Sequence, residues 1–219
     1  MRRLSLALTA IAIPAATLAA QSEAPPDWRS APDRPARLVS CPPASDSTIF
    51  FVTMPPGWHA ATGPGALLYP ADVEARGRYV LEAEIFIFPD ATDAEYGVFA
   101  GGRELGGNGQ RWTGFVLRRD GAVAVLRSGG GGAASPVRDW TVNDAVLRPE
   151  GNEPVRNRLR VTVEADSVVM RVNGLEVFTL GRNEIDSDGL VGFRLGAGVN
   201  LHVVRLDLTR RFATVPSAR

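Results

Sequence analysis

The sequence has one cysteine, two histidines and no lysine. A single cysteine cannot form an internal disulfide, so the fold has to be stabilised by its core. His59 and His202 lack metal-ligand spacing and a cysteine partner, which argues against a zinc site. The 24 basic residues, all arginine, are scattered and balanced by 24 acidic residues. This balance gives no electrostatic reason to expect nucleic acid or an anionic membrane surface as a partner.

Motifs that would define a reaction are also missing. No Gly-x-Ser-x-Gly stretch supports a serine hydrolase. The glycine-rich segments 101–109 and 129–135 are not followed by a segment of helical periodicity, which a phosphate-binding loop requires. Beyond the N-terminus, no apolar run approaches the ~20 residues of a membrane-spanning helix. The sequence therefore predicts neither a nucleotide-binding fold nor a transmembrane segment.

The N-terminal stretch MRRLSLALTAIAIPAATLAAQ has the organisation of a signal peptide. Arg2 and Arg3 precede an apolar region over residues 4–18, and small residues then place cleavage after Ala19 or Ala20. We therefore predict a signal peptide over residues 1–20 and a secreted or periplasmic mature protein. The sequence Leu-Val-Ser-Cys ending at Cys41 resembles a bacterial lipobox, but it lies well past the apolar region, so lipid attachment is not expected.

The remaining chain divides into a leader, one domain and a tail. Residues 21–47 are rich in Pro and Ala without periodicity and predict a flexible leader. Residues 48–211 contain about eleven or twelve short strand-like runs separated by turn signals, with no clear helix. Residues 212–219 form a tail. This pattern predicts an all-β domain made of two antiparallel sheets packed face to face, arranged as a jelly roll.

Alternation within the longest runs predicts which side chains face the core. In residues 78–88, alternate residues from Tyr79 to Ile87 are apolar, whereas Glu82 and Glu84 share the other face. In the ribbon 159–180, alternate Leu, Val and Met residues predict a core face, and Asn173-Gly174 predicts a tight hairpin turn. This ribbon is expected to be scaffold.

A family resemblance covers roughly residues 49–209. The stretch NRLRVTVEADSVVMRVNGLEVFTL, followed by DGLVGFRLGAGVNLHVVRLDL, resembles the closing half of concanavalin A-like lectin/glucanase sandwiches. The laminin-G-like and 3-keto-disaccharide-hydrolase-like branches are the most similar. GRYVLEAEIFIF resembles their central strand. The resemblance implies a concanavalin A-like jelly roll, a fold that hosts many activities.

The resemblance does not extend to the catalytic residues of that family. DAEYGVFAGG stands where the hydrolase-like branch has an Asn-Ser-Gly motif, and the Glu-x-Asp-x-x-Glu triplet of glucanases is missing. Glu82 and Glu84 are the remaining candidates for catalysis, because two carboxylates ~7 Å apart on one strand face can serve a glycosidase. The alternative is that both face solvent or pair with arginines of a neighbouring strand.

Loop-borne tryptophans are candidates for a sugar platform, with polar partners in the loop 101–112. The candidate ligand-binding residues are Trp58, Arg103, Asn108, Arg111, Trp112 and Trp140. The alternative is that the tryptophans plug the ends of the sandwich. Two acidic turns, with Asp186 and Asp188 in one and Asp90 and Asp93 in the other, are candidates for calcium, although such residues also form ordinary turns.

These observations favour an exported, non-catalytic β-sandwich that binds carbohydrate or a cell-envelope glycan, with calcium as the only cofactor considered. Two alternatives stay open at this point. One is a carbohydrate-active hydrolase of the 3-keto-disaccharide hydrolase or glucanase type. The other is a cell-envelope module that binds another protein.

Overall fold

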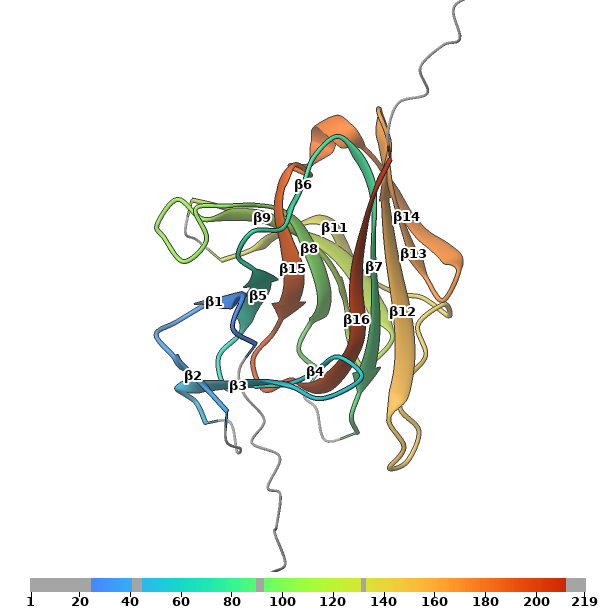
Figure 1. Cartoon of the computed structure of the whole chain (residues 1–219). Helices are drawn as coiled ribbons and strands as arrows, with labels where there is room; N and C mark the ends of the chain where they lie inside the picture. The colour runs from blue at the N-terminus through green and yellow to red at the C-terminus, as the bar shows by residue number, and fades with distance from the viewer. Residues whose placement is uncertain (1–24, 41–44, 90–92, 131–132, 212–219) are drawn as a thin grey trace, which may run out of the picture.

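Two eight-stranded sheets pack face to face in the computed structural model, which describes residues 25–40, 45–89, 93–130 and 133–211 (Figure 1). The predicted signal peptide, Cys41 and the C-terminal tail lie outside the described residues. In the described part of the chain the only helix is a short 3-10 turn, Arg182–Glu184. No helix there is long and apolar enough to cross a membrane. The all-β, two-sheet prediction is confirmed.

The first sheet, sheet A, has the strand order β1-β5-β15-β8-β9-β10-β11, with the short β6 also paired to β15. All of these pairs are antiparallel. Its strands are β1 Trp28–Pro32, β5 Ala66–Pro70, β6 Glu74–Ala75, β8 Tyr96–Arg103, β9 Arg111–Leu117, β10 Ala122–Gly129, β11 Ser135–Val142 and β15 Gly189–Leu195.

The second sheet, sheet B, has the order β14-β13-β12-β7-β16-β4-β3-β2. Its pairs are antiparallel except β2 with β3. Its strands are β2 Arg37–Val39, β3 Thr48–Thr53, β4 Trp58–Thr62, β7 Arg78–Ile87, β12 Val155–Val163, β13 Ser167–Val172, β14 Leu175–Gly181 and β16 Asn200–Arg211. Fourteen of the sixteen strands lie in the described part of residues 48–211, where eleven or twelve were expected.

The main core lies between the sheets and follows the predicted alternation. On β7, Tyr79, Leu81, Ala83, Ile85 and Ile87 are fully buried, as the sequence predicts. The inward residues of β12 and β13 complete this layer. Burial of this continuous apolar surface is the main stabilising contribution to the fold.

The ribbon formed by β12, β13 and β14 has the predicted hairpin. Asn173 and Gly174 both have positive φ, at 51° and 89°, as a tight turn of this kind requires. The Asn173 side chain also accepts a hydrogen bond from the Arg158 backbone N–H at 2.9 Å. The turn therefore fixes the register of β14 against β13, and the Asn173 side chain ties this end of the hairpin to β12.

The expected boundary at Thr48 is too late, because the predicted leader supplies β1 and β2. Trp28 stacks on Phe193 with ring centroids 5.3 Å apart and meets Phe51 edge-on at 5.2 Å. β1 then extends sheet A by pairing with β5. A polar, Pro-rich composition concealed this strand, because its packing depends on one large side chain and not on a periodic pattern.

Candidate functional site

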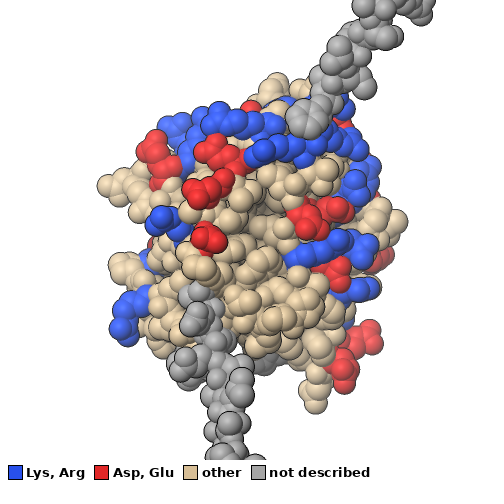
Figure 2. Space-filling view, viewed as in Figure 1, with Lys and Arg blue, Asp and Glu red and all other residues tan. Residues whose placement is uncertain are grey.

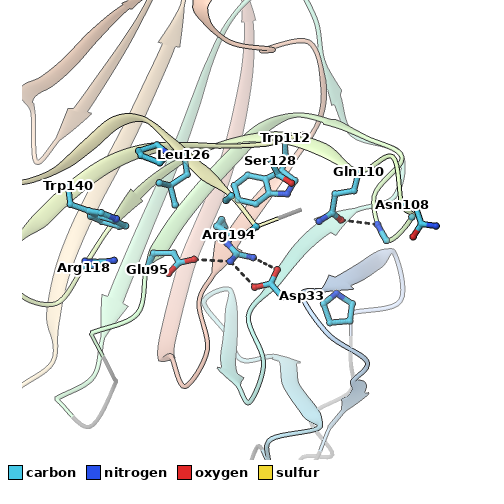
Figure 3. Close-up of a pocket in the computed structure, with 16 residues that line it drawn as sticks. Asp33, Glu95, Asn108, Gln110, Trp112, Arg118, Leu126, Ser128, Trp140 and Arg194 are labelled. Atoms are coloured by element: carbon cyan, nitrogen blue, oxygen red, sulfur yellow. Dashed lines mark hydrogen bonds and ion pairs between the residues drawn. The ribbon is translucent and has the colours of Figure 1, made fainter. Parts of the chain in front are cut away.

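Sheet A buries a second apolar cluster on the face that points away from sheet B. Its members are Ala31, Leu67, Tyr69, Phe99, Trp112, Val116, Ala124 and Leu126. Outer faces of sandwiches normally carry polar residues, so a buried apolar layer there indicates that other parts of the chain cover the sheet. The segment that follows β1, the loop before β9 and residues 133–134 before β11 lie beside this cluster and line a pocket (Figure 3).

The pocket has a volume of about 670 Å³, which is within the range of small-molecule sites. Five strands contribute to it, namely β1, β9, β10, β11 and β15, together with Glu95 just before β8 and the loop before β9. Its lining residues with polar or aromatic side chains are Asp33, Glu95, Asn108, Gln110, Trp112, Arg118, Ser128, Trp140 and Arg194. Such a mixture of aromatic surface and convergent polar groups is typical of ligand sites.

Trp112 lies on the floor of this pocket because of the residues around it on the sheet. It faces Ser128 directly across β9 and β10, and only 3% of its surface is exposed. Gly114, two residues along β9, makes room for the indole, since a Cβ there would approach the ring to 2.9 Å. A larger residue at Gly114 would therefore force the indole out of its place.

Arg194 places a buried positive charge beside this indole. Its Nη1 and Nη2 donate to the two carboxylate oxygens of Asp33 at 2.6 and 2.8 Å, and Nη2 also donates to Glu95 at 2.8 Å. The guanidinium carbon lies 5.1 Å from the Trp112 ring centre. Burial acts to lower the pKa of Arg194, but the hydrogen bonds and charges of Asp33 and Glu95 outweigh it and raise the pKa. The guanidinium is therefore held charged and fixed.

Four residues that line the pocket each carry a buried polar atom without a hydrogen-bond partner within the described residues. The atoms are Trp112 Nε1, Arg118 Nε, Ser128 Oγ and Arg194 Nε. A buried polar atom without a partner costs free energy, about 1–3 kcal/mol in mutational series. Such atoms are uncommon in folded proteins, and here four of them belong to residues of one pocket.

Trp140 forms a side wall of the pocket, and the Arg118 guanidinium covers one face of its ring. The guanidinium carbon lies 3.7 Å from the ring centre, within the range of cation–π attraction. Trp140 is itself partly exposed. The pocket thus offers one tryptophan on its floor and one on its side, from β9 and β11 (Figure 3).

The structure brings together three of the predicted ligand-binding residues, because Asn108, Trp112 and Trp140 all line the pocket. Trp58 lies elsewhere. It packs against the main core, with its ring centre 4.9 Å from Trp28 and 6.1 Å from Phe193. This position corresponds to the alternative reading, in which a tryptophan plugs the sandwich.

Arg103 and Arg111 also lie outside the pocket lining. They face each other across β8 and β9, and both are exposed. Arg103 donates from Nε and Nη2 to the backbone carbonyl of Asp188 at 3.3 and 3.2 Å, so it tethers the turn before β15.

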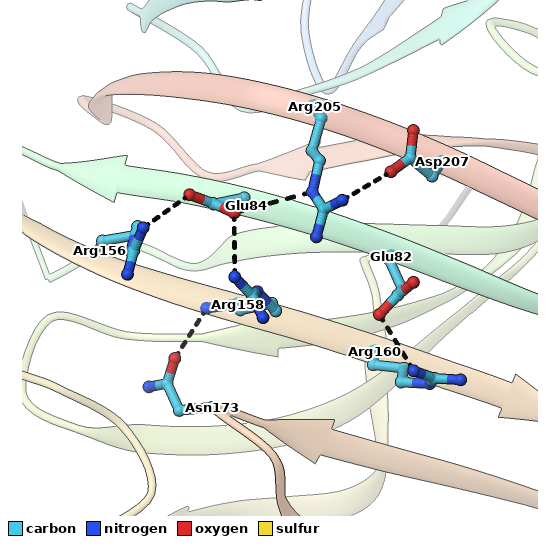
Figure 4. Close-up of polar contacts among 8 residues, drawn as sticks. All are labelled: Glu82, Glu84, Arg156, Arg158, Arg160, Asn173, Arg205 and Asp207. Atoms are coloured by element: carbon cyan, nitrogen blue, oxygen red, sulfur yellow. Dashed lines mark hydrogen bonds and ion pairs between the residues drawn. The ribbon is translucent and has the colours of Figure 1, made fainter.

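Glu82 and Glu84 lie on the outer face of sheet B, away from this pocket (Figure 4). Glu82 accepts from Arg160 at 3.3 Å, and Glu84 accepts from Arg156 at 3.1 Å and Arg158 at 3.5 Å. Both therefore have the arrangement expected of the structural alternative, in which the glutamates pair with arginines of the neighbouring strand.

The calcium candidates are not gathered into a cation site in the described residues. Asp188 Oδ1 accepts from Arg182 at 2.8 Å and from the Gly77 N–H at 3.1 Å, and the Asp186 carbonyl accepts from Thr113. Asp93 is exposed, and Asp90 lies outside the described residues. No group of three His, Cys, Asp or Glu side chains placed to hold a metal occurs in the described residues.

Sequence reasoning missed the charged residues of the pocket. Asp33 belonged to the presumed leader, and Glu95 and Arg118 carried no motif. Arg194 did carry a signal, because it is the only charged residue in the strand sequence GLVGFRL. A lone arginine in a strand that is otherwise buried requires a partner, which could have been sought.

Comparison with known proteins gives structural neighbours only. No family model and no curated protein matches the chain. A carbohydrate-binding module, CBM66, from Bacillus subtilis aligns with a TM-score of 0.60 at 10% identity, over 84% of this chain and 96% of that one. A protein of unknown function with a galectin-like fold, from the same organism, aligns at 0.59 and 9%, over 84% and 89%.

A GH16 protein from a mixed-linkage glucan locus of Bacteroides ovatus, in complex with a product, aligns with a TM-score of 0.55 at 9% identity, over 83% of this chain and 94% of that one. At such low identities these likenesses concern the fold alone. The strand order and these neighbours agree that the chain adopts the concanavalin A-like jelly roll that its sequence resembles.

Proposed function

We propose that the pocket on sheet A binds a carbohydrate without transforming it. The observation that carries this proposal is the group of four unpartnered polar atoms beside two tryptophans. A sugar ring has apolar C–H faces that pack on indoles, and its hydroxyl groups both donate and accept hydrogen bonds. Ser128 Oγ and the N–H groups of Trp112 and Arg118 are therefore suited to such hydroxyls.

The charge of the pocket favours a neutral saccharide. Two cations, Arg118 and Arg194, stand against two anions, Asp33 and Glu95. Arg194 is already shared between the two carboxylates, so it has little attraction left for an anionic ligand. Both carboxylates are likewise engaged in holding Arg194. The arrangement supports binding and orientation more than acid–base catalysis, which needs a carboxyl group that can exchange a proton with the substrate.

The structural neighbours agree with this class of ligand, since one is a carbohydrate-binding module and another is a GH16 protein with a bound product. We include export in the proposal, on the strength of the N-terminal sequence, so the ligand would be a glycan of the cell envelope or its surroundings. The hydrolase alternative depended on Glu82 and Glu84, and their pairing with arginines does not favour it.

A glycan array with the purified protein tests the proposal, run with calcium and again with a chelator. We expect a hit among neutral oligosaccharides that the chelator does not remove. Trp140→Ala should weaken that binding at least tenfold, because the ring supplies a wall of the pocket. Phe178→Ala, which removes a partly exposed aromatic ring of β14 that lines neither pocket, is the matched control and should leave the binding unchanged.

A blank array from a folded sample would contradict the proposal and favour the protein-interaction alternative. Equal affinity of the Trp140→Ala variant for its glycan would show that binding occurs elsewhere. Loss of glycan binding when the chelator is added would instead indicate a calcium site that the described residues do not reveal.

A further inference from the structure

A second groove, lined mainly by arginines, crosses the outer face of sheet B. It has a volume of about 570 Å³ and lies over β7, β12 and β13. Four arginines and a single glutamate are its charged lining residues, namely Arg156, Arg158, Arg160, Arg171 and Glu82. In the space-filling view, basic side chains alternate with acidic ones on the side of the molecule where β12 and β16 lie (Figure 2).

The arginines form a row because β12 alternates. Arg156, Arg158 and Arg160 are every second residue of the strand, so all three project from the outer face about 7 Å apart. Arg171 faces Arg160 directly across the pair of β12 with β13. Like charges placed opposite each other in a sheet are unfavourable unless an anion relieves their repulsion.

Carboxylates at the base of the row position these arginines and leave most of their donors unused. Glu84 is largely buried, with 12% of its side chain exposed, and contacts Arg156 at 3.1 Å and Arg158 at 3.5 Å (Figure 4). Glu82 reaches Arg160 at 3.3 Å. Each guanidinium has five N–H donors in a fork, and between 36% and 55% of each of the four arginine side chains is exposed.

The remaining neighbours of the row lie to its sides. Glu176 on β14 pairs with Arg171 at 2.9 Å, and Asp207 on β16 pairs with Arg205 at 3.2 Å. Arg205 also approaches Glu84, at 3.7 Å. Neither Glu176 nor Asp207 lines the groove, so a ligand in it meets a surface with a surplus of positive charge.

An apolar wall borders the arginines, formed by Phe86, Pro154 and Leu147. Leu147 is 51% exposed. The buried Asn157 side chain bonds both backbone groups of Leu147, accepting from its N–H and donating to its C=O, each at 2.9 Å. The wall is thus preorganised beside the charged row.

We propose that this groove binds an acidic polysaccharide whose sugar rings carry carboxylate groups. Guanidinium forks match planar carboxylates in a bidentate manner, and a linear row of such forks suits a linear polyanion. The exposed Leu147 and the partly exposed Phe86 would contact the C–H faces of its rings. The inference goes beyond the neutral-glycan pocket of sheet A and does not depend on it, since the groove lies on the other sheet.

Calorimetric titration of the full-length protein with polygalacturonate oligosaccharides tests this proposal. We expect binding at low ionic strength that weakens as salt is added. The double substitution Arg158→Gln and Arg160→Gln should reduce the affinity at least about tenfold per arginine, because each removes a charge-assisted hydrogen-bonding group. The corresponding double Lys variant keeps both charges but loses the fork geometry of the guanidinium groups. Its affinity should lie between those of the wild type and the double Gln variant.

Arg76→Gln is the matched control, because it removes an exposed, ion-paired arginine outside the groove and should leave the affinity unchanged. Trp140→Ala should also bind polygalacturonate normally, which separates this groove from the pocket on sheet A. Melting curves report whether each variant folds.

Three results would overturn the proposal. One is a wild-type protein that does not bind polygalacturonate at low salt. Another is an Arg158/Arg160 double variant that folds and binds as tightly as the wild type. The third is equal or tighter binding of poly-glutamate, which would show that the row recognises an acidic polypeptide.

Discussion

At the scale of single residues, Arg194 links the stability of the domain to the shape of the sheet A pocket. It holds two carboxylates, from Asp33 and Glu95, that come from segments far apart in the sequence. We predict that Arg194→Met destabilises the protein by roughly 3 kcal/mol, because two anions then lie close together without their shared cation. The figure is at the low end for a buried pair since Asp33 is 40% exposed. Denaturant unfolding measures it.

The control for this prediction is Arg76→Met, since Arg76 and Glu74 form an exposed ion pair at 2.7 Å. Its free energy of unfolding should match that of the wild type, because solvent screens exposed pairs. If Arg194→Met proves as stable as this control, the buried pairing does not contribute to folding.

At the scale of elements, β1 is the part of the fold whose importance is least visible in the sequence. Its Trp28 contacts three aromatic residues of the core, and the strand leads directly to Asp33 in the pocket. We predict that Trp28→Ala lowers the free energy of unfolding by roughly 3 kcal/mol, through lost apolar contacts and a cavity. The melting temperature should fall by several degrees, whereas Leu175→Ala, at an exposed site, should barely change it.

The turn between β12 and β13 gives an element-level prediction about pH. Glu164 in this turn bonds Arg78 at the start of β7 and Arg211 at the end of β16, so it ties three strand ends together. The hydrogen bond from Arg78 is the largest cause that lowers the pKa of Glu164 below its usual value. A carboxyl with a lowered pKa in the folded state stabilises the protein above its ordinary pKa.

This stabilisation is lost as the pH falls through the lowered pKa of the folded state, because protonation breaks the pairs with both arginines. We therefore expect the melting temperature of the wild type to fall on acidification below about pH 4, the ordinary range of a glutamate. Glu164→Gln should melt lower than the wild type at pH 7, and the difference should shrink at acid pH. An unchanged difference would mean that Glu164 does not titrate with folding.

At the scale of the whole molecule, local patterns predicted the scaffold better than the site. Alternation identified the core face of β7, and Asn173-Gly174 identified the hairpin, because both signals come from neighbouring residues. The pairing of Asp33 with Arg194 joins residues 161 positions apart, and no local pattern encodes it. The prediction that the loop-borne tryptophans form a site is therefore only partly matched. Trp112 and Trp140 line the pocket, whereas Trp58 packs against the core.

The two proposed sites lie on the outer faces of different sheets, with the hydrophobic core between them. Packed sheets are ~10 Å apart and close-packed, so a ligand on one face has no direct contact with a ligand on the other. No side chain lines both sites among the described residues. We therefore predict that the protein binds a neutral glycan and a polyuronate at the same time and with independent affinities.

Titrating one ligand into protein saturated with the other measures this independence. Equal dissociation constants in the presence and absence of the second ligand are expected, because a coupling free energy requires the two ligands to favour different states of the fold. Competition would indicate a single shared site and would contradict the assignment of separate roles to the two sheets. Simultaneous binding would let the domain connect two kinds of polysaccharide. The site on sheet A would then bind through aromatic residues and balanced charges, and the site on sheet B through its arginines.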